Sequence, residues 1–265
     1  MSRLSKKDRQ GIILIAGVIL VALGMVAFNA YLSGRPRPDE RNCVAPVTAK
    51  TVFVIDQSDA IPEQTASEMR SRAMKTVAEV VQANELVSVF VITEQSRTKL
   101  LPVFSACKPQ QDGSELTENV KAIQRRFTEN FQKPFEAALA VAAKKSEASP
   151  LGEAIIDLSL SDSLRAGKSR LVLYSDMMQH SENSSLYGCS DGNAAIQSFR
   201  LHRAGAVERP TFKNTDVQLN FIPREGVGEA VAACRTRFWA WFFGDNDGAN
   251  AALTTDYLPG GAKVS

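Results

Sequence analysis

Short apolar runs alternate with amphipathic stretches along most of this chain. The apolar, β-branched runs at 51–55, 86–93 and 170–175 have the length of buried strands. Apolar residues recur every three or four positions over 62–83 and 151–164, which predicts helices. Strands that alternate with helices imply right-handed crossovers and a largely parallel sheet. The pattern therefore predicts an α/β fold, doubly wound, with a mostly parallel central sheet flanked by helices.

The other segments complete this fold. Residues 98–104 alternate polar and apolar positions after a short polar turn, so they predict an antiparallel edge strand. The further elements expected are one or two helices over 116–145, broken near Pro134, helices over 193–203 and 226–243, and a strand over 217–223.

The N-terminal region follows a different pattern. No charged or strongly polar side chain occurs from Gly11 to Phe28, and the nearest charges are Arg9 and Arg35. At about 1.5 Å per residue, this stretch nearly crosses the hydrocarbon core of a bilayer. A cleaved signal peptide is the alternative, but the apolar region is long for one and no small-x-small cleavage site follows it. We therefore expect one retained transmembrane helix over 11–33.

The length of 265 residues provides room for one domain of moderate size and an appendage. Pro36, Pro38 and several charges follow the apolar stretch and indicate a stiff, solvated linker. The expected organisation is a cytoplasmic stub over 1–10, the transmembrane helix over 11–33, a linker over 34–47, a domain over 48–245 and a tail over 246–265.

Charge and cysteine content indicate the class of partner and the cellular compartment. The 31 basic and 29 acidic residues balance, which argues against a nucleic-acid partner because such proteins show a basic face. The four cysteines lack a Cys-x-x-Cys pair and accompany only two histidines, so they do not indicate zinc. Disulfides in an oxidising compartment fit them better, with free buried thiols as the alternative.

Basic residues flank the apolar stretch on both sides, so the positive-inside rule favours a cytoplasmic N-terminus only slightly. We expect a single-pass inner-membrane protein with its domain in a bacterial periplasm.

Polar residues follow two of the apolar runs and precede one predicted helix. The run 51–55 stops at Asp56, with Ser58 two residues on, and the run 171–174 ends at Ser175-Asp176. Ser149-Pro150-Leu151-Gly152-Glu153-Ala154-Ile155 opens the helix. Taken in order along the chain, at 56–58, 149–155 and 175–176, the motifs resemble the three metal loops of the von Willebrand factor A (vWA) domain: Asp-x-Ser-x-Ser, Thr-Pro-Leu-Gly-x-Ala-Leu, and Thr-Asp or Ser-Asp. The resemblance covers roughly 48–245; Ala60 stands where the first motif has its last Ser.

The resemblance implies a metal site at the carboxyl ends of the strands, where open parallel sheets hold their ligands. It assigns Ser58 and Ser149 as hydroxyl ligands, with Asp56 and Asp176 acting directly or through water. Such oxygen donors suit Mg²⁺ or Mn²⁺. In the family, an acidic side chain of a partner often fills the remaining position. Ala60 removes one hydroxyl, so a metal-free scaffold in which the two carboxylates cap loops is the alternative.

The expected topology also predicts how the cysteines pair. Cys43 precedes the first strand and Cys107 follows the reversed edge strand, so both lie at the bottom edge of the sheet. Cys189 and Cys234 follow two other strands, towards the top edge. We expect disulfides between Cys43 and Cys107 and between Cys189 and Cys234, because other pairings would cross the sheet and exceed the Cα separation of about 7 Å that a disulfide allows.

The last predicted helix ends in a dense aromatic cluster: Phe238, Trp239, Trp241, Phe242 and Phe243. At 100° per residue these side chains cannot all face one way. Trp239 and Trp241 are therefore candidates for binding a partner or membrane headgroups. The alternative is that the tail after Gly244 folds back and covers them.

For function, the resemblance implies a membrane-anchored, non-catalytic domain that binds a protein partner in a membrane or envelope complex. A structural envelope component with an inert site is one alternative, and a metal-dependent hydrolase is another. A hydrolase would need more carboxylate or His ligands and a general base. His180 lies near Ser175 and Ser181 in sequence, but no Gly-x-Ser-x-Gly elbow occurs. We therefore do not expect an enzyme.

Overall fold

The computed structural model describes residues 6–34, 37–58, 61–97, 100–113, 119–140, 146–165, 167–182, 184–212, 214–244 and 253–258. The chain divides into two compact units, Met1–Pro38 and Asp39–Ser265.

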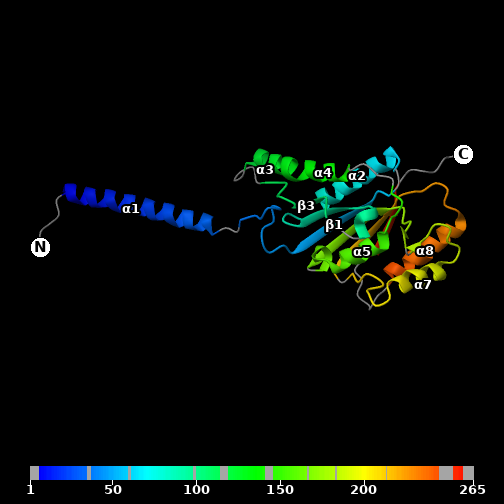
Figure 1. The fold of residues 1–265 in the computed structure, drawn as a ribbon. Helices are drawn as coiled ribbons and strands as arrows, with labels where there is room; N and C mark the ends of the chain where they lie inside the picture. Colours follow the sequence, from blue (N-terminus) through cyan, green and yellow to red (C-terminus); the bar gives the residue numbers. More distant parts are fainter. Residues whose placement is uncertain are drawn as a thin grey trace. The chain divides into compact units, whose positions relative to one another are not determined.

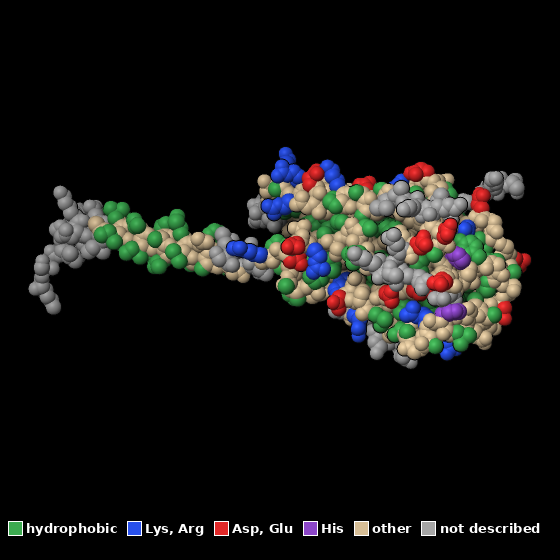
Figure 2. All heavy atoms as spheres, viewed as in Figure 1, with side chains coloured by type: hydrophobic (Ala, Val, Ile, Leu, Met, Phe, Trp, Pro, Cys, Tyr) green, Lys and Arg blue, Asp and Glu red, His purple; other side chains and the backbone are tan. Residues whose placement is uncertain are grey.

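The first unit is built on one helix, α1, over Lys6–Ser33 (Figure 1). Within it, Leu14–Tyr31 has a mean hydropathy of 2.2 and is long and apolar enough to cross a membrane. Apolar side chains along this stretch are exposed, as the green spheres on the helix in Figure 2 show. Because a helix that is apolar on all sides is a buried or a membrane-spanning one, this surface suits a bilayer.

The second unit is built on a six-stranded sheet with the strand order β3-β2-β1-β4-β7-β8. All neighbouring strands pair in parallel except β2 and β3, which are antiparallel. The strands are β1 Ala49–Asp56, β2 Leu86–Ile92, β3 Phe104–Cys107, β4 Lys168–Ser175, β7 Thr215–Phe221 and β8 Leu253–Tyr257. The expected mostly parallel sheet with a reversed edge strand is confirmed.

Helices cover both faces of this sheet (Figure 1). One layer contains α2 Glu63–Glu79, α3 Val120–Phe127, the π-helical turn η2 Thr128–Gln132 and α4 Lys133–Leu139. The other contains α5 Leu151–Leu160, α6 Asp162–Arg165, α7 Gly192–His202 and α8 Glu229–Phe243. A short 3₁₀ turn, η1 Glu94–Arg97, follows β2, and a small hairpin of β5 His180–Ser181 and β6 Ser184–Ser185 follows β4.

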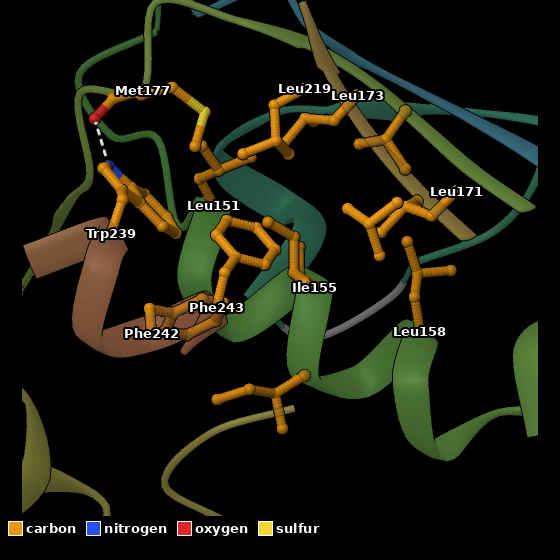
Figure 3. Packing of buried hydrophobic residues seen from close by; sticks show 14 of the residues in the cluster. Leu151, Ile155, Leu158, Leu171, Leu173, Met177, Leu219, Trp239, Phe242 and Phe243 are labelled. Atoms are coloured by element: carbon orange, nitrogen blue, oxygen red, sulfur yellow. Dashed lines mark hydrogen bonds between the residues drawn. The ribbon is translucent and has the colours of Figure 1, made fainter. Parts of the chain in front are cut away.

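Alternate residues of the central strands enter two separate cores. Val52 and Val54 of β1 pack in the core that includes α5 and α8, whereas Phe53 and Ile55 pack in the core that includes α2 and α4. Figure 3 shows the first core, in which Leu151 and other α5 side chains meet β4 and the aromatic end of α8. Burial on both faces explains why these strands are continuous apolar runs.

Three elements differ from those expected. The edge strand expected over 98–104 is β3, which starts at Phe104; Pro102 precedes it and has no N–H to give to the sheet. The helix expected to break near Pro134 continues through η2, since a wider turn accommodates a residue without an N–H. The tail expected over 246–265 contains β8, which adds a strand to the sheet.

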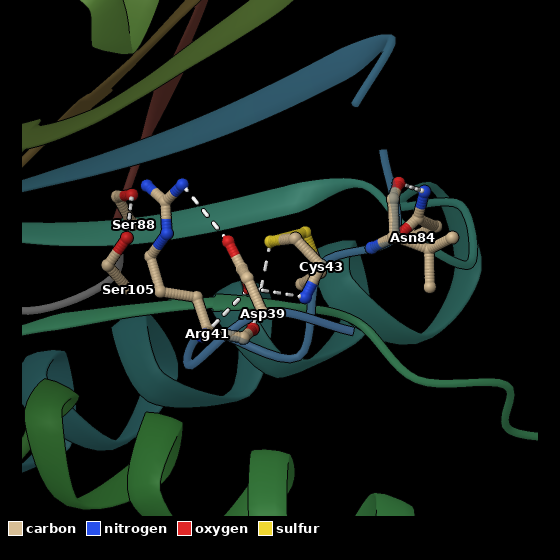
Figure 4. Close-up of a disulfide and its surroundings, with 8 residues drawn as sticks. Asp39, Arg41, Cys43, Asn84, Ser88 and Ser105 are labelled. Atoms are coloured by element: carbon tan, nitrogen blue, oxygen red, sulfur yellow. Dashed lines mark hydrogen bonds and ion pairs between the residues drawn. A yellow bond between two sulfur atoms is a disulfide. The ribbon is translucent and has the colours of Figure 1, made fainter. Parts of the chain in front are cut away.

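The structure pairs Cys43 with Cys107 and Cys189 with Cys234, the two disulfides expected from the topology. Their Cα separations are 4.9 Å and 6.1 Å. Beside Cys43, the Asp39 carboxylate accepts the backbone N–H of Arg41 and of Cys43 (Figure 4). The segment from Asp39 onward, expected to be linker, is therefore tied into the domain.

Candidate metal and partner site

Asp56 is the centre of the candidate site. It ends β1, and its side chain is almost fully buried. Its carboxylate accepts the Ser58 hydroxyl at 2.8 Å, the Ser58 N–H at 3.1 Å, the Ser175 hydroxyl at 2.8 Å and the Ser149 hydroxyl at 3.2 and 3.3 Å. Because β1 and β4 are parallel neighbours, their carboxyl ends coincide and bring Asp56 and Ser175 together. The three motifs therefore meet at one edge of the sheet.

Ser149 is held in place by the chain around it. Its N–H donates to the His180 carbonyl at 2.6 Å, and the His180 N–H donates back at 2.9 Å. In the same motif, the Gly152 N–H donates to the side-chain oxygen of Gln179 at 2.7 Å. A Cβ at Gly152 would lie 3.1 Å from the Phe199 ring, so any other residue here would require that ring to shift slightly. The loop after β4 thus fixes the start of α5, and with it the Ser149 hydroxyl.

Asp176 contributes the second carboxylate. One oxygen accepts the Met178 N–H at 2.9 Å, and the other forms an ion pair with the Arg224 guanidinium. Arg224 also stands over the Tyr187 ring, 5.0 Å from its centre. Arg224 is not among the predicted site residues, although it comes directly after the strand predicted over 217–223, where side chains reach the same edge of the sheet.

A small cavity opens among these groups. It measures about 50 Å³ and is lined by Asp56, Ser58, Ile61, Asp176, Ile222, Pro223 and Arg224. One water needs about 10–15 Å³ of such space, so the cavity has room for an ion together with bound water. Ser149 joins this group through its hydrogen bonds to Asp56.

The cavity is electrostatically unbalanced. Burial, with the neighbouring charge of Asp176, raises the pKa of Asp56 to about 6, although the hydrogen bonds from Ser175 and Ser58 act the other way. Two carboxylates share the cavity with one guanidinium, so ionising both leaves a charge of about −1. A bound cation would lower that cost.

The donor set fits a hard cation. A hydroxyl that donates its proton to Asp56 keeps its oxygen lone pairs for a metal, and carboxylate and hydroxyl oxygens are ligands that Mg²⁺ accepts. Asp56, Ser58, Ser149 and Asp176 are the residues that could hold the ion. Among the described residues, no group of three or more His, Cys, Asp or Glu side chains is arranged for a metal, so an ion here would keep water ligands. Ala60 lies outside the described residues.

The arrangement considered for a hydrolase is not formed. The His180 ring nitrogen Nδ1 hydrogen-bonds Ser185 at 2.9 Å. The Ser175 hydroxyl donates to Asp56, and the Ser181 hydroxyl donates to Glu153 at 2.8 Å. None of these contacts joins His180 to Ser175 or Ser181 as base to nucleophile.

The two tryptophans of α8 lie in different surroundings. Trp239 is 4% exposed and donates its indole N–H to the Met177 carbonyl at 2.7 Å (Figure 3). Its expected role in binding a partner is therefore wrong, because the indole is part of the core behind the loop that follows β4. Trp241 is partly buried, with the Arg209 guanidinium 5.5 Å from its ring centre. Residues of β8 lie near Trp239 across a cavity of about 240 Å³ between β8 and α8.

Several solved structures are similar in fold. The VWA domain of SpRpn10 is 11% identical with a TM-score of 0.37, covering 80% of this chain and 90% of that one. An aerotolerance-related membrane protein from Bacteroides fragilis is 11% identical with a TM-score of 0.32, covering 80% and 92%. The pilus adhesin SpaC from Lactobacillus rhamnosus GG is 8% identical with a TM-score of 0.42, covering 85% of this chain and 29% of that one. No protein-family model and no curated protein sequence matches the chain. Identities this low concern the fold alone, so function must be argued from the site.

Proposed function

We propose that this chain is a membrane-anchored, non-catalytic interaction protein that binds a protein partner at the carboxyl edge of its sheet. The observation that carries the proposal is the convergence of three separate loops on the buried carboxylate of Asp56, beside a cavity that also contains Asp176. The hydroxyls of Ser58, Ser149 and Ser175 are ordered there by hydrogen bonds to that carboxylate. Such an edge is where open α/β sheets bind their ligands.

A divalent cation, Mg²⁺ or Mn²⁺, would be held by Ser58 and Ser149 together with Asp56 and Asp176. When both carboxylates are ionised, the charges of Asp56, Asp176 and Arg224 sum to −1, and a divalent ion changes the sum to +1. A site of net charge +1 attracts an anionic group. An acidic side chain of the partner, bound at the ion, fits that charge.

The domain would lie outside the cytoplasmic membrane, in the periplasm of a bacterium, with the N-terminus in the cytoplasm. Two features support this arrangement. The apolar stretch Leu14–Tyr31 is long enough to span a bilayer, and the two disulfides suit an oxidising compartment. The partner would then belong to a membrane or envelope complex.

One observation favours a second candidate, a structural envelope component with an inert site. The ion pair between Arg224 and Asp176 already neutralises one of the two carboxylates. In that case the hydrogen bonds to Asp56 would only stabilise the loops, and no ion or partner would bind there.

The test uses the full chain in detergent and the double variant Asp56→Ala/Asp176→Ala. We expect calorimetric titration of the wild type with MgCl₂ and MnCl₂ to give saturable binding that the double variant loses. Affinity capture from membranes should yield a partner that is lost in the variant and on chelation. The matched control is Glu63→Ala/Glu129→Ala, whose carboxylates are 85% and 52% exposed on other elements. Circular dichroism checks that both variants fold. Capture and titration that are the same in wild type and double variant would favour the inert component.

A further inference from the structure

Arg224 already occupies part of the candidate site with a positive charge. Its guanidinium pairs with Asp176 and lines the same cavity as Asp56. The pair is sheltered, since the side chains of Arg224 and Asp176 are only 24% and 11% exposed. Water and salt weaken such a pair less than they weaken a pair on the surface.

A second contact fixes the guanidinium at this place. Arg224 lies between β7 and α8, and its guanidinium stands over Tyr187, which follows β6. A cation over an aromatic face is attracted by the negative charge of the ring. Two loops thus deliver a cation to a cavity whose carboxylates come from the ends of β1 and β4.

Resting on the metal site proposed above, we infer that Arg224 is a tethered cation that competes with a divalent ion for Asp176 and so sets the affinity of the site. A guanidinium and a divalent ion beside one carboxylate repel each other. A divalent ion can therefore bind to Asp176 only when Arg224 moves away, and the ion pair between Arg224 and Asp176 is then lost.

The competition makes the ion and an acidic partner cooperative. The planar guanidinium released from Asp176 can pair with a carboxylate through two parallel hydrogen bonds. A partner carboxylate that pairs with Arg224 removes the competitor, so the divalent ion binds more tightly. By linkage, the bound ion increases the affinity for the partner by the same factor. Without the partner, Arg224 keeps the affinity for the ion low.

The decisive variant is Arg224→Gln, which removes the charge and retains a polar side chain. Titration calorimetry of the full chain in detergent with MgCl₂ and MnCl₂ should show about tenfold tighter binding than in the wild type, equivalent to about 1.4 kcal/mol. The matched control is Arg235→Gln. Arg235 donates to the backbone carbonyl of Asp176 at 3.0 Å and does not pair with its carboxylate. The affinity of the Arg235→Gln protein for either metal ion should stay within about twofold of that of the wild type.

The outcomes separate this inference from the proposed function. Binding by Arg224→Gln that is equal to or weaker than that of the wild type would overturn the competition and leave the metal site standing. Absence of binding in both the wild type and Arg224→Gln would overturn the metal site and the inference with it. Binding that appears only in Arg224→Gln supports the competition.

A second variant decides if Arg224→Gln fails to fold. Tyr187 is 45% exposed, so Tyr187→Leu removes the aromatic support without disturbing the core. We expect it to tighten metal binding about two- to threefold, because Arg224 is then held less firmly beside Asp176. An unchanged affinity in a folded Tyr187→Leu protein would contradict the inference.

Discussion

The Ser149 hydroxyl reaches both oxygens of the Asp56 carboxylate, at 3.2 and 3.3 Å, although 93 positions separate the two residues in sequence. Asp56 ends β1, the first strand of the domain. Ser149 precedes α5, which covers the face of the sheet opposite to α2. The contact joins the start of α5 to the central edge of the sheet. Ser58 and Ser175 complete a set of hydroxyls directed at one carboxylate.

Substitutions of Ser149 should distinguish a ligand from a structural hydroxyl. We expect Ser149→Ala to weaken Mg²⁺ binding about tenfold, because an oxygen ligand is lost. Ser149→Thr retains the hydroxyl and should bind like the wild type. Calorimetric titration of the full chain measures both.

Ser175→Ala provides the control for this experiment. It removes another hydrogen bond to Asp56, at 2.8 Å, but Ser175 is not a proposed ligand. Its affinity should therefore fall less than that of Ser149→Ala. If both alanine variants weaken binding equally, Ser149 acts only by orienting Asp56.

Asp56 should make the stability of the domain depend on pH. Its pKa is raised from 3.8 to about 6, first by burial and then by the charge of Asp176. Because the fold favours the protonated carboxyl, this contribution is present in full below about pH 3.8 and is lost as the pH rises through about 6. Asp56→Asn cannot ionise, so its stability relative to the wild type should increase over that range by up to about 3 kcal/mol.

Urea unfolding in a chelating buffer at several pH values between 4 and 7.5 measures this difference. Acidic groups that do not interact with Asp56 titrate alike in both proteins and cancel. The control is Asp112→Asn, which removes an exposed carboxylate outside the site. A stability difference between Asp56→Asn and the wild type that does not change with pH would contradict the raised pKa.

Most of the fold could be predicted from the sequence because its central strands are buried on both faces. The runs that end at Ile55 and Ser175 are apolar at nearly every position, and their ends also predicted where Asp56 and Asp176 lie. The β8 strand could not be predicted this way. Its side chains are exposed along its whole length, so no alternation marks Leu253–Tyr257 as a strand.

The parts of the site that were missed depend on contacts between distant loops. Nothing in the sequence around Arg224 indicates that its partner is Asp176, because an ion pair over 48 positions leaves no periodic signal. Trp239 was misassigned for a related reason. Aromatic density predicts neither which ring faces inward nor that the Met177 carbonyl, in the loop after β4, accepts the indole N–H.

The buried and the partly buried tryptophan should respond differently to truncation. Trp239→Ala leaves a cavity in the core and loses the hydrogen bond to Met177, so we expect a destabilisation of about 3–5 kcal/mol. Trp241→Ala should cost less, since that side chain is only partly buried. Thermal unfolding followed by circular dichroism checks the order, and an equal loss in both variants would contradict it.

The two disulfides should stabilise the domain to a similar degree. They join residues 64 and 45 positions apart, and loops of this size restrict the unfolded chain by about 4 kcal/mol each. We therefore expect Cys43→Ser/Cys107→Ser and Cys189→Ser/Cys234→Ser each to lower the unfolding midpoint in urea. A reductant should lower the midpoint of the wild type towards those of the variants.

The stabilisation by the two disulfides is lost in a reducing compartment. The domain made in the cytoplasm without its anchor should therefore be less stable than the domain exported in the full chain. Equal midpoints for the exported and the cytoplasmic protein, with the disulfides absent from both, would contradict the proposed periplasmic location.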